Sequence, residues 1–448
     1  MTGPPGRERS RSGPPRGGRP LVDPARQAAY EAVAAVHRDD AYANLALPKI
    51  LRELRLHGRD AAFATELTYG TLRWTGTLDQ IIAVAAKREM ARIDPPARDA
   101  LRLGAYQLLH MRVASHAAVA STVDLVRAVA GPGPTGFANA VLRRIEATPL
   151  DEWIDTVAPD REQDPLGYLA VKHAHPPWIV RAFKEALGED VEPLLAADNA
   201  PAPVHLCARP GLIDRDELVQ QTAGTPGMLS PYAVHLPGGA PGDLLAVTSG
   251  RAHVQDEGSQ VVALALADAP LDGTDERWLD LCAGPGGKAG LLGALAAQRG
   301  AHVTAVEIAP HRAELVRQAV RGLPVTVETQ DGREVEDEGF DRVLVDAPCS
   351  GLGALRRRPE SRWRRQPSDL PPLTRLQREL LTRALDVVRP GGLVAYVTCS
   401  PHVVETRVTV GEAIRRSPHT VEKVEERQLW PHRGGTDAMY LALLRRAR

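Results

Sequence analysis

The sequence predicts three folded parts in order: an all-α helical bundle, a small α+β module, and a C-terminal α/β domain with a doubly wound parallel sheet. The chain has 448 residues, which is too long for a single hydrophobic core. From Asp23 to about residue 145, apolar residues recur at helical spacing without competing strand-like alternation. From about residue 243 onward, apolar strands alternate with helical segments, which is the rhythm of a parallel sheet covered by helices.

The bulk composition excludes several classes of protein. Hydrophobic residues make up 43% and charged residues 25% of the chain, as in soluble globular proteins, and the net charge of -1 does not by itself favour nucleic acid. The four cysteines form no C-x-x-C pair, so we expect neither a disulfide framework nor a metal site. No apolar run has membrane-spanning length and the N-terminus has no signal-peptide core, so we expect a cytoplasmic protein with no membrane partner. The sequence is silent on oligomeric state, and a monomer is the default expectation.

The N-terminal part should be a basic tail followed by the helical bundle. Residues 1–21 are mostly Gly, Pro, Arg and Ser, which predicts a disordered basic tail. Its five arginines would add non-specific attraction to phosphates, although a solvated extension needs no such role. Residues 22–148 carry the helical periodicity and predict a bundle of five or more helices.

The middle of the chain, residues 149–242, should hold a connector and a small module. Residues 149 to about 170 contain prolines and acids and predict the connector. A strand over 202–209 and a helix over 214–221 predict an α+β module, which ends where Pro and Gly cluster near residue 242. Cys207 lies in that strand and is interpreted as a small buried apolar residue.

The C-terminal domain, residues 243–448, should alternate strands and helices around a parallel sheet. Strands are expected over 278–282, 303–308, 325–328, 342–346, 393–398 and 439–443, and helices over 287–297, 310–321 and 370–388. Ligands bind outside the carboxyl ends of the strands in such a sheet. The residues that follow each strand are therefore the candidate site.

A Gly-rich loop follows the first of these strands. The segment Asp280-Leu-Cys-Ala-Gly-Pro-Gly-Gly-Lys288 contains three glycines, which let a backbone turn tightly and approach a ligand closely. The helix that begins there adds N–H donors and the positive end of a dipole. The spacing differs from the G-x-G-x-x-G fingerprint and lacks the Walker ending, so the loop alone indicates only a nucleotide or nucleoside binder.

Acidic residues stand at the ends of successive strands. Glu307 ends the second strand, where it can accept hydrogen bonds from both hydroxyls of a ribose, and Asp331 follows the third, where it can meet an adenine amino group. Asp346 ends the fourth strand. Each acid alone is more often a helix cap or a turn residue. Together with a Gly-rich first loop, the series resembles the S-adenosylmethionine methyltransferase fold, whose cationic sulfonium ligand suits carboxylates.

This resemblance implies a Rossmann-like class I methyltransferase domain with S-adenosyl-L-methionine as its cofactor. The residues that it assigns to the cofactor site are Cys282, Ala283, Gly284, Pro285, Gly286, Gly287, Lys288, Glu307, Asp331 and Asp346. Within this set we expect Cys282 to pack rather than react. Lys288 should touch the methionine carboxylate or the substrate, unless it simply faces solvent.

Two cysteines complete the pattern of the C-terminal domain. The apolar run over 343–345 leads into Asp346-Ala-Pro-Cys349-Ser-Gly, and the strand over 393–398 ends in Thr398-Cys399-Ser-Pro. Two thiols and a carboxylate at strand ends indicate nucleophilic chemistry on an electrophilic ring. These motifs resemble those of RNA (cytosine-5) methyltransferases, specifically the bacterial RsmB/Sun (Fmu) group.

The resemblance to this group covers nearly the whole chain. Residues 66–73, 100–109 and 136–143 resemble the NusB fold, an RNA-binding helical domain that the group carries before its catalytic domain. Residues 255–260 (Gln-Asp-Glu-Gly-Ser-Gln) and 437–440 (Asp-Ala-Met-Tyr) also match, although Gly-Phe-Phe more often follows that Asp. Where the group often has a Glu-Asn pair, this chain has Glu405 and Thr406, so we assign neither a catalytic role.

The resemblance implies a reaction and a partner. Cys399 would attack carbon 6 of a cytosine, Asp346 would hydrogen-bond the ring, and Cys349 would help to release the product after carbon 5 is methylated. The implied partner is RNA, with 16S rRNA as the expected substrate and tRNA as the alternative for the same chemistry. Buried structural thiols and a redox pair are the other interpretations of the two cysteines.

An arginine-rich segment between the cysteines is the candidate RNA contact. Residues 356–365 hold six arginines and one glutamate. A charge run is often only a solvated face, but beside a base-modifying site it suits phosphates, with an aromatic ring for stacking. We therefore expect Arg358, Arg362 and Trp363 to contact RNA, with Arg358 supported by a similar Arg-Pro-acid segment in the group.

Two other classes of function stay open. A nicotinamide-dependent Rossmann oxidoreductase would need a different glycine spacing and gives the cysteines no task. An RNA-binding assembly factor with a degenerate methyltransferase domain would not need an intact Asp346, Cys349 and Cys399.

Overall fold

The computed structural model of the chain describes residues 22–447, which divide into two compact units. The first unit holds the described residues up to Ala41 together with Leu45–Thr71 and Ile81–Pro149. The second unit holds Tyr42–Asn44, Leu72–Gln80 and the chain from Leu150 onward. The basic tail expected over residues 1–21 lies outside the described residues.

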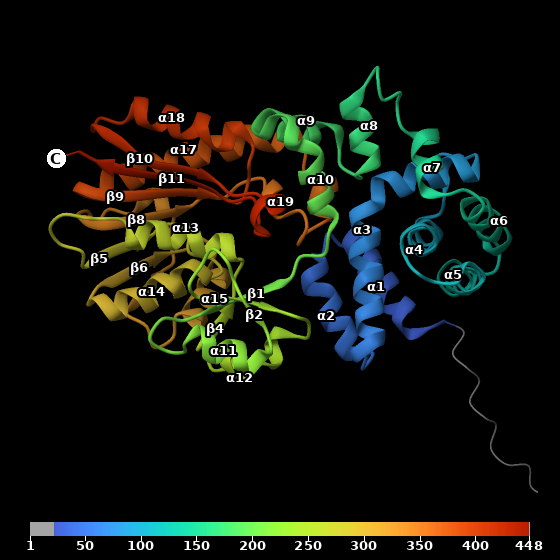
Figure 1. Cartoon of the computed structure of the whole chain (residues 1–448), viewed down its shortest axis with the longest axis horizontal. Coiled ribbons are helices and arrows are strands. Elements are labelled where there is room, and N and C mark those ends of the chain that lie inside the picture. The colour runs from blue at the N-terminus through green and yellow to red at the C-terminus, as the bar shows by residue number, and fades with distance from the viewer. Residues whose placement is uncertain (1–21, 448) are drawn as a thin grey trace, which may run out of the picture. The chain divides into compact units, whose positions relative to one another are not determined.

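The first unit is helical, as the spacing of its apolar residues predicts (Figure 1). Its residues come from α1 (Pro24–Arg38), α2 (Ala43–Glu53), α3 (Gly58–Ala86), α4 (Pro95–His110), α5 (Ser115–Ala130) and α6 (Thr135–Glu146). Asp23 caps α1 by accepting a hydrogen bond from the backbone N–H of Arg26 at 3.0 Å. The core of this unit contains Leu101 and Leu142, both fully buried.

The second unit begins with helices and a small antiparallel sheet. The helices are α7 (Leu150–Val157), α8 (Pro165–Lys172), α9 (Pro177–Leu187) and α10 (Val191–Asn199), so the stretch expected to be a connector is largely helical. The sheet has the strand order β2-β3-β1-β4. It is formed by β1 (Val204–Ala208), β2 (Thr225–Pro226), β3 (Ala233–Leu236) and β4 (Ala252–Val254), with α11 (Arg215–Thr222) and α12 (Leu245–Thr248). Cys207 is buried in β1, as interpreted from the sequence.

A second, seven-stranded sheet has the order β10-β11-β9-β8-β5-β6-β7. Its strands are β5 (Arg277–Asp280), β6 (His302–Val306), β7 (Val325–Glu328), β8 (Phe340–Asp346), β9 (Val388–Thr398), β10 (Val421–Gln428) and β11 (Tyr440–Arg446). The neighbours from β9 to β7 are parallel, whereas β11 and β10 are antiparallel, which corrects the expected parallel sheet to a mixed one. The sequence did not predict β10, because this exposed edge strand is mostly charged and has no apolar alternation.

Helices cover both faces of the large sheet (Figure 1). In β8, Val343 and Val345 pack against α17 (Leu370–Val387) and α18 (Arg407–Arg416), while Leu344 packs on the other face with α13 (Glu257–Asp268) and α14 (Gly287–Arg299). The predicted order of a helical bundle, a small α+β module and a doubly wound α/β domain is thereby confirmed. The cofactor and catalytic residues expected from the sequence all follow or end one of the parallel strands β5–β9, at one edge of the sheet.

Within residues 22–447, no helix combines the length and apolar content that crossing a membrane requires. The same residues contain no group of three or more His, Cys, Asp or Glu side chains arranged to hold a metal ion.

Candidate active site

The loop between β5 and α14 is shaped by two glycines. Gly284 lies against Glu307: its N–H donates to Oε2 at 3.1 Å, and a Cβ on Gly284 would lie 2.2 Å from the same oxygen. Gly286 has φ +109°, and a Cβ there would lie 2.6 Å from the Cβ of Ala319 in α15 (Pro310–Ala319). Because side chains are excluded at both positions, the loop presents bare backbone at the edge of the sheet.

The carboxylates after β6 and β7 are held by nearby residues. Glu307 is buried and accepts hydrogen bonds from the N–H of Gly284, from the N–H of Ala309 at 2.9 Å, and from Arg312 Nη2 at 2.7 Å. Asp331 pairs with Arg333, whose Nη2 lies 2.6 Å from Oδ2, and this pairing lowers the pKa of Asp331. Glu307 therefore adjoins the Gly-rich loop directly, whereas Asp331 stands two strands away from β5.

Asp280 is a further candidate site residue, which the sequence analysis included in the Gly-rich segment but did not assign to the cofactor site. It ends β5 with no exposed surface, and its Oδ1 accepts a hydrogen bond from the Cys282 N–H at 3.3 Å. Its Oδ2 has no hydrogen-bond partner among the described residues. Burial, followed by the neighbouring carboxylate of Asp346, raises the pKa of Asp280 to about 7. The signal was present in the sequence, since Asp280 ends its strand just as Asp346 does.

These features fit a small cationic ligand. A buried carboxylate oxygen without a partner, beside a backbone cradle, is an acceptor that a bound donor satisfies. Lys288, the cation of the loop, is already paired: its Nζ lies 2.7 Å from Asp346 Oδ2. Acids at the strand ends and a neutralised lysine favour a positively charged nucleoside over a phosphate.

The Lys288–Asp346 pair joins the loop to the end of β8. Burial lowers the pKa of Lys288, but the Asp346 carboxylate more than reverses this effect, so the pKa of Lys288 is raised overall. The ammonium stays protonated and occupies one oxygen of a partly exposed carboxylate. Asp346 can therefore receive a further hydrogen bond from a ligand on its exposed side.

The two cysteines predicted to act together lie side by side. The parallel pairing of β8 with β9 sets Asp346 opposite Val397, and the loops that follow bring Cys349 Sγ and Cys399 Sγ to 3.4 Å. The hydrogen bond from Cys349 lowers the pKa of Cys399, burial opposes this shift, and the Lys288 ammonium supports it. The same hydrogen bond and burial raise the pKa of Cys349. Cys399 is thus the thiol that ionises more readily.

Cys282 stands apart from this pair. It packs against the core on the α17 side of the sheet, and burial raises the pKa of its thiol well above the ordinary value. This environment favours a packing role in the loop.

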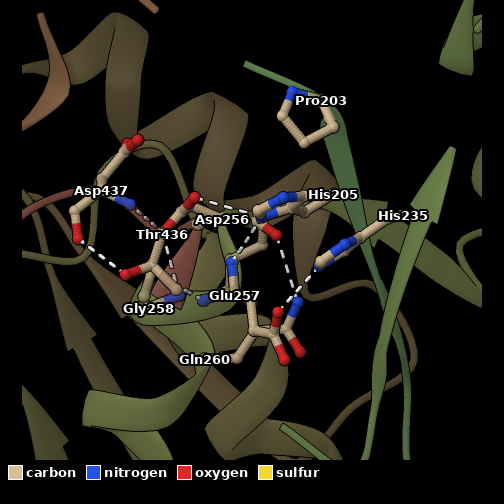
Figure 2. A network of polar contacts seen from close by, with 12 residues as sticks. Pro203, His205, His235, Asp256, Glu257, Gly258, Gln260, Thr436 and Asp437 are labelled. Carbon is tan, nitrogen blue, oxygen red and sulfur yellow. Dashed lines mark hydrogen bonds and ion pairs between the residues drawn. The ribbon is translucent and has the colours of Figure 1, made fainter. Parts of the chain in front are cut away.

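A network of polar contacts connects segments that are distant in the chain (Figure 2). Figure 2 shows Asp256, at the start of α13, between the loop of Asp437 and the ring of His205 from β1. Asp256 Oδ1 accepts from the Asp437 N–H at 3.0 Å, and Asp256 Oδ2 lies 2.6 Å from Arg357 Nη2. Arg357 Nε also donates to Asp437 Oδ1 at 3.0 Å, and Arg356 Nε lies 3.2 Å from the same oxygen.

This network gives a structural role to two motifs that the sequence analysis noted without assigning them a function. The segment 255–260 supplies Asp256, and the segment 437–440 supplies Asp437. Between them they neutralise Arg356 and Arg357, so these two arginines of the run hold the protein together instead of facing solvent.

The three expected RNA contacts have different surroundings. Arg362 has no exposed surface, and its Nη1 donates to the Ala174 carbonyl and to Asn199 Oδ1, both at 2.9 Å. Trp363 donates from Nε1 to the Leu72 carbonyl at 2.8 Å. Only Arg358 is exposed, with its guanidinium 5.6 Å from the centre of the Tyr42 ring. Arg362 and Trp363 therefore pack inside the second unit, where Arg362 Nη1 and Trp363 Nε1 are hydrogen-bonded to the protein itself.

Family models match both parts of the chain. Residues 269–445 match the model described as 16S rRNA methyltransferase RsmB/F, and residues 23–147 match the NusB family.

Curated relatives match over almost the full length. Ribosomal RNA small subunit methyltransferase B of Pseudomonas putida is 32% identical, with 94% of this chain and 98% of the relative covered. The protein of the same name in Pseudomonas syringae pv. tomato is 31% identical over 94% of this chain and 96% of the relative. A Mycobacterium tuberculosis protein, whose name gives it as a methyltransferase without a substrate, is 54% identical over 96% of this chain and 97% of the relative.

Solved structures share the fold. The crystal structure of PH0851 matches with a TM-score of 0.80 and 23% identity, over 95% of this chain and 99% of that one. NSun6 from Pyrococcus horikoshii with SFG matches with a TM-score of 0.54 and 16% identity, over 62% of this chain and 99% of that one.

Proposed function

We propose that this chain, which belongs to the RsmB/F family of 16S rRNA methyltransferases and uses S-adenosyl-L-methionine, methylates carbon 5 of a cytosine in 16S rRNA through a covalent adduct of Cys399. One observation carries the proposal: two thiols lie 3.4 Å apart next to a carboxylate that is paired with the lysine of the cofactor loop. A buried structural cysteine needs no such neighbours. A nucleophile needs a lowered pKa, and Cys399 has one.

The proposed reaction begins at carbon 6 of the ring. Cys399 Sγ, as the thiolate, forms a bond to carbon 6, and the electron pair of the carbon 5–carbon 6 double bond makes carbon 5 nucleophilic. Asp346 binds the polar edge of the base and offsets the charge that develops there, while Lys288 holds Asp346 in place. When bound, S-adenosylmethionine supplies the methyl group that carbon 5 takes up.

Release reverses the first step. The proton on carbon 5 is lost to a base, the double bond re-forms, and the Cys399–carbon 6 bond breaks to return the thiolate. Cys349, whose pKa is raised by the hydrogen bond to Cys399 and by burial, holds a proton beside the departing sulfur and so assists this step.

The cofactor would lie along the other half of the edge. The backbone of residues 282–288, Glu307, Asp331 and the unpaired oxygen of Asp280 are the groups that we propose hold it. The exposed Arg312 now bound to Glu307 is the group that a ribose would replace.

RNA is the proposed partner, because the relatives carry ribosomal RNA in their names and residues 23–147 match the NusB family. The target base would be unpaired or flipped out of its stack to reach the thiols. Arg358 is the residue of its segment that we propose contacts phosphate. We propose that the protein acts as a monomer in the cytoplasm.

The test is transfer of a labelled methyl group to unmodified 16S rRNA and to tRNA by wild type, Cys399→Ala and Cys349→Ala. Wild type should label 16S rRNA, with mapping to carbon 5 of a cytosine, and Cys399→Ala should be inactive. Cys349→Ala should accumulate a protein–RNA adduct that survives denaturing electrophoresis. Full activity in Cys399→Ala would contradict the assignment of Cys399 as the nucleophile. Preferential labelling of tRNA would identify tRNA as the substrate in place of 16S rRNA. No transfer by wild type to either RNA would favour a non-catalytic assembly factor.

A further inference from the structure

A buried carboxylate lies directly behind both cysteine loops. Glu405 has no exposed surface and belongs to a short 3-10 turn after β9. Its Oε1 accepts hydrogen bonds from the Ser350 N–H at 2.8 Å and from Gln377 Nε2 at 3.1 Å. Its Oε2 accepts from Ser350 Oγ at 2.5 Å and from Ser400 Oγ at 2.6 Å. All four donors contact Glu405, a side chain to which the sequence analysis assigned no role.

The donors come from the residues that follow the two cysteines. Ser350 comes directly after Cys349 and Ser400 directly after Cys399, and the two hydroxyl oxygens lie 3.0 Å apart. Gln377 extends the connection, since its Nε2 also donates to the carbonyl of Pro348 at 2.8 Å. The carboxylate therefore ties together the backbone on both sides of Cys349 and the residue after Cys399.

Glu405 accepts hydrogen bonds on both of its oxygens. Its Oε1 faces two N–H donors, and its Oε2 faces two hydroxyls, which can donate or accept. An amide of the same shape would carry no charge and would place its NH₂ against these hydroxyls, which would then have to accept instead of donate. Burying a carboxylate without a charged partner is unfavourable, and the four hydrogen bonds to Glu405 offset this cost.

We propose that Glu405 is a positioning residue that fixes the Cys349 loop against the Cys399 loop, so that the two thiols meet the same base in the correct order. The proposal rests on the proposed function only in taking these thiols as the reacting groups. Reacting groups tolerate little displacement: an error of about 1 Å can lower a rate by about 100-fold. The thiols are in contact at 3.4 Å, so loosening either loop separates them.

The charge of Glu405 also distinguishes the two thiols. The hydrogen bond to Cys399 and burial raise the pKa of Cys349, and the Glu405 carboxylate adds to the rise. A negative charge behind Cys349 thus keeps that thiol protonated while Cys399 ionises. The hydrogen bonds of Glu405 and its charge therefore both favour a pair of thiols in which Cys399 reacts and Cys349 stays protonated.

The experiment compares Glu405→Gln, Ser350→Ala and Ser400→Ala with the control Asp341→Asn. Asp341 is a buried carboxylate with several donors at the opposite end of β8, including Arg389 Nε at 2.6 Å. Each variant is tested for thermal unfolding, for kcat and KM in methyl transfer, and for alkylation of the two cysteines by iodoacetamide across pH, mapped by peptide mass. The alkylation needs no RNA, so it reports on the thiols even if the substrate assignment fails.

For Glu405→Gln we expect kcat about 100-fold lower with little change in the KM for S-adenosylmethionine. The ratio of Cys399 to Cys349 alkylation should fall by about tenfold, since removing one nearby charge shifts a pKa by about one unit. Ser350→Ala and Ser400→Ala should shift the ratio less, and should add little when combined with Glu405→Gln. Asp341→Asn should lower the unfolding temperature and leave the alkylation ratio unchanged.

A wild-type alkylation ratio and kcat in Glu405→Gln would overturn the proposal, and so would the same ratio change in Asp341→Asn. If Glu405→Gln does not fold, Ser400→Ala decides in its place, because it removes one hydrogen bond and no charge. A wild-type enzyme that transfers no methyl group, combined with the expected alkylation shift, would reject the proposed function and retain Glu405 as the residue that positions the thiols.

Discussion

The cofactor half and the thiol half of the site share one edge of a sheet but are held in place differently. In the cofactor half, the arginines that pair with the carboxylates lie close to them in the chain. Glu307 pairs with Arg312, five residues later, and Asp331 pairs with Arg333, two residues later. The glycines of the loop pack against later segments, Gly284 against Glu307 and Gly286 against Ala319. The ion pairs of this half are therefore local, although its loop is not.

The thiol half depends on residues far apart in the chain. Glu405 binds the N–H of Ser350, 55 residues earlier, and Asp256 binds Arg357, 101 residues later. We expect groups that are fixed by long-range contacts to move when one contact is lost, and groups that are paired within a few residues of the chain to move less. The difference predicts that substitutions will act on catalysis in one half and on binding in the other.

Asp346 belongs to both halves, so its substitution should affect catalysis and cofactor binding together and should have the largest effect. Asp346→Asn should lower kcat by about 1,000-fold, because the base loses its charged partner. It should also raise the KM for S-adenosylmethionine, because a buried Lys288 loses its counter-charge. Steady-state methyl transfer measures both. Asp331→Asn is the matched variant at another strand end and should raise the KM alone; a large fall of kcat there would contradict the division into halves.

Arg357→Ala tests the long-range contacts of the thiol half. It removes one of the two arginines that the buried carboxylates of Asp256 and Asp437 share with Arg356, which should lower the free energy of unfolding by about 3 kcal/mol. Urea unfolding measures the loss. The control Arg365→Ala removes a half-exposed ion pair with Asp369 at 3.8 Å and should change the free energy of unfolding by less than about 0.5 kcal/mol. Equal effects of the two variants would argue against a network at this place.

Asp280→Asn tests the cofactor half through the pH dependence of the free energy of unfolding. Burial and Asp346 raise the pKa of Asp280 from 3.8 to about 7, so the folded protein keeps a proton that the unfolded chain releases. Stability then falls as the pH rises between those values, by about 2 kcal/mol from about pH 5 to about pH 7. Asparagine has no such proton, so the variant should lose this part of the slope. Urea unfolding at both pH values decides, and an unchanged slope would contradict the assignment.

Arg358→Gln should have the smallest effect, because Arg358 is exposed and belongs to neither half. RNA binding should weaken a few-fold, with the salt dependence reduced by about one released ion. The control is Arg415→Gln, an exposed arginine in the last turn of α18. Binding to labelled RNA at several salt concentrations measures both variants, and identical salt slopes would remove Arg358 from the proposed RNA surface.

The sequence located the strand ends of the site well because a buried strand and its motif are continuous in the chain. The strand expected over 325–328 is β7 itself, and Asp346 ends β8 as expected. The apolar run ends where the candidate site residues begin, so the same short stretch of sequence marks both the end of the strand and the candidate site. The residues proposed for the cofactor half stand at such strand ends, including Asp280, which the sequence analysis treated as part of the loop.

The thiol half was less readable because its supports are set by the tertiary fold. Arg362 stands in a run of arginines that looks solvent-exposed, yet it points inward to carbonyls that the sequence cannot bring near it. Glu405 was set aside because Thr406 departs from the expected pair, although its own partners are Ser350 and Ser400. Local composition does not show which long-range partner a polar side chain meets.

The network around Asp256 and Arg357 also limits where the chain can be cut. A fragment that began at β5 would keep every residue of the cofactor loop and both cysteines, yet it would lack His205, Asp256 and Glu257. The buried Asp437 and the half-buried Arg357 would then lack the Asp256 carboxylate and backbone that they contact. The smallest autonomous catalytic fragment should therefore start before β1, and the small sheet is better regarded as an inseparable part of the enzyme than as an accessory module.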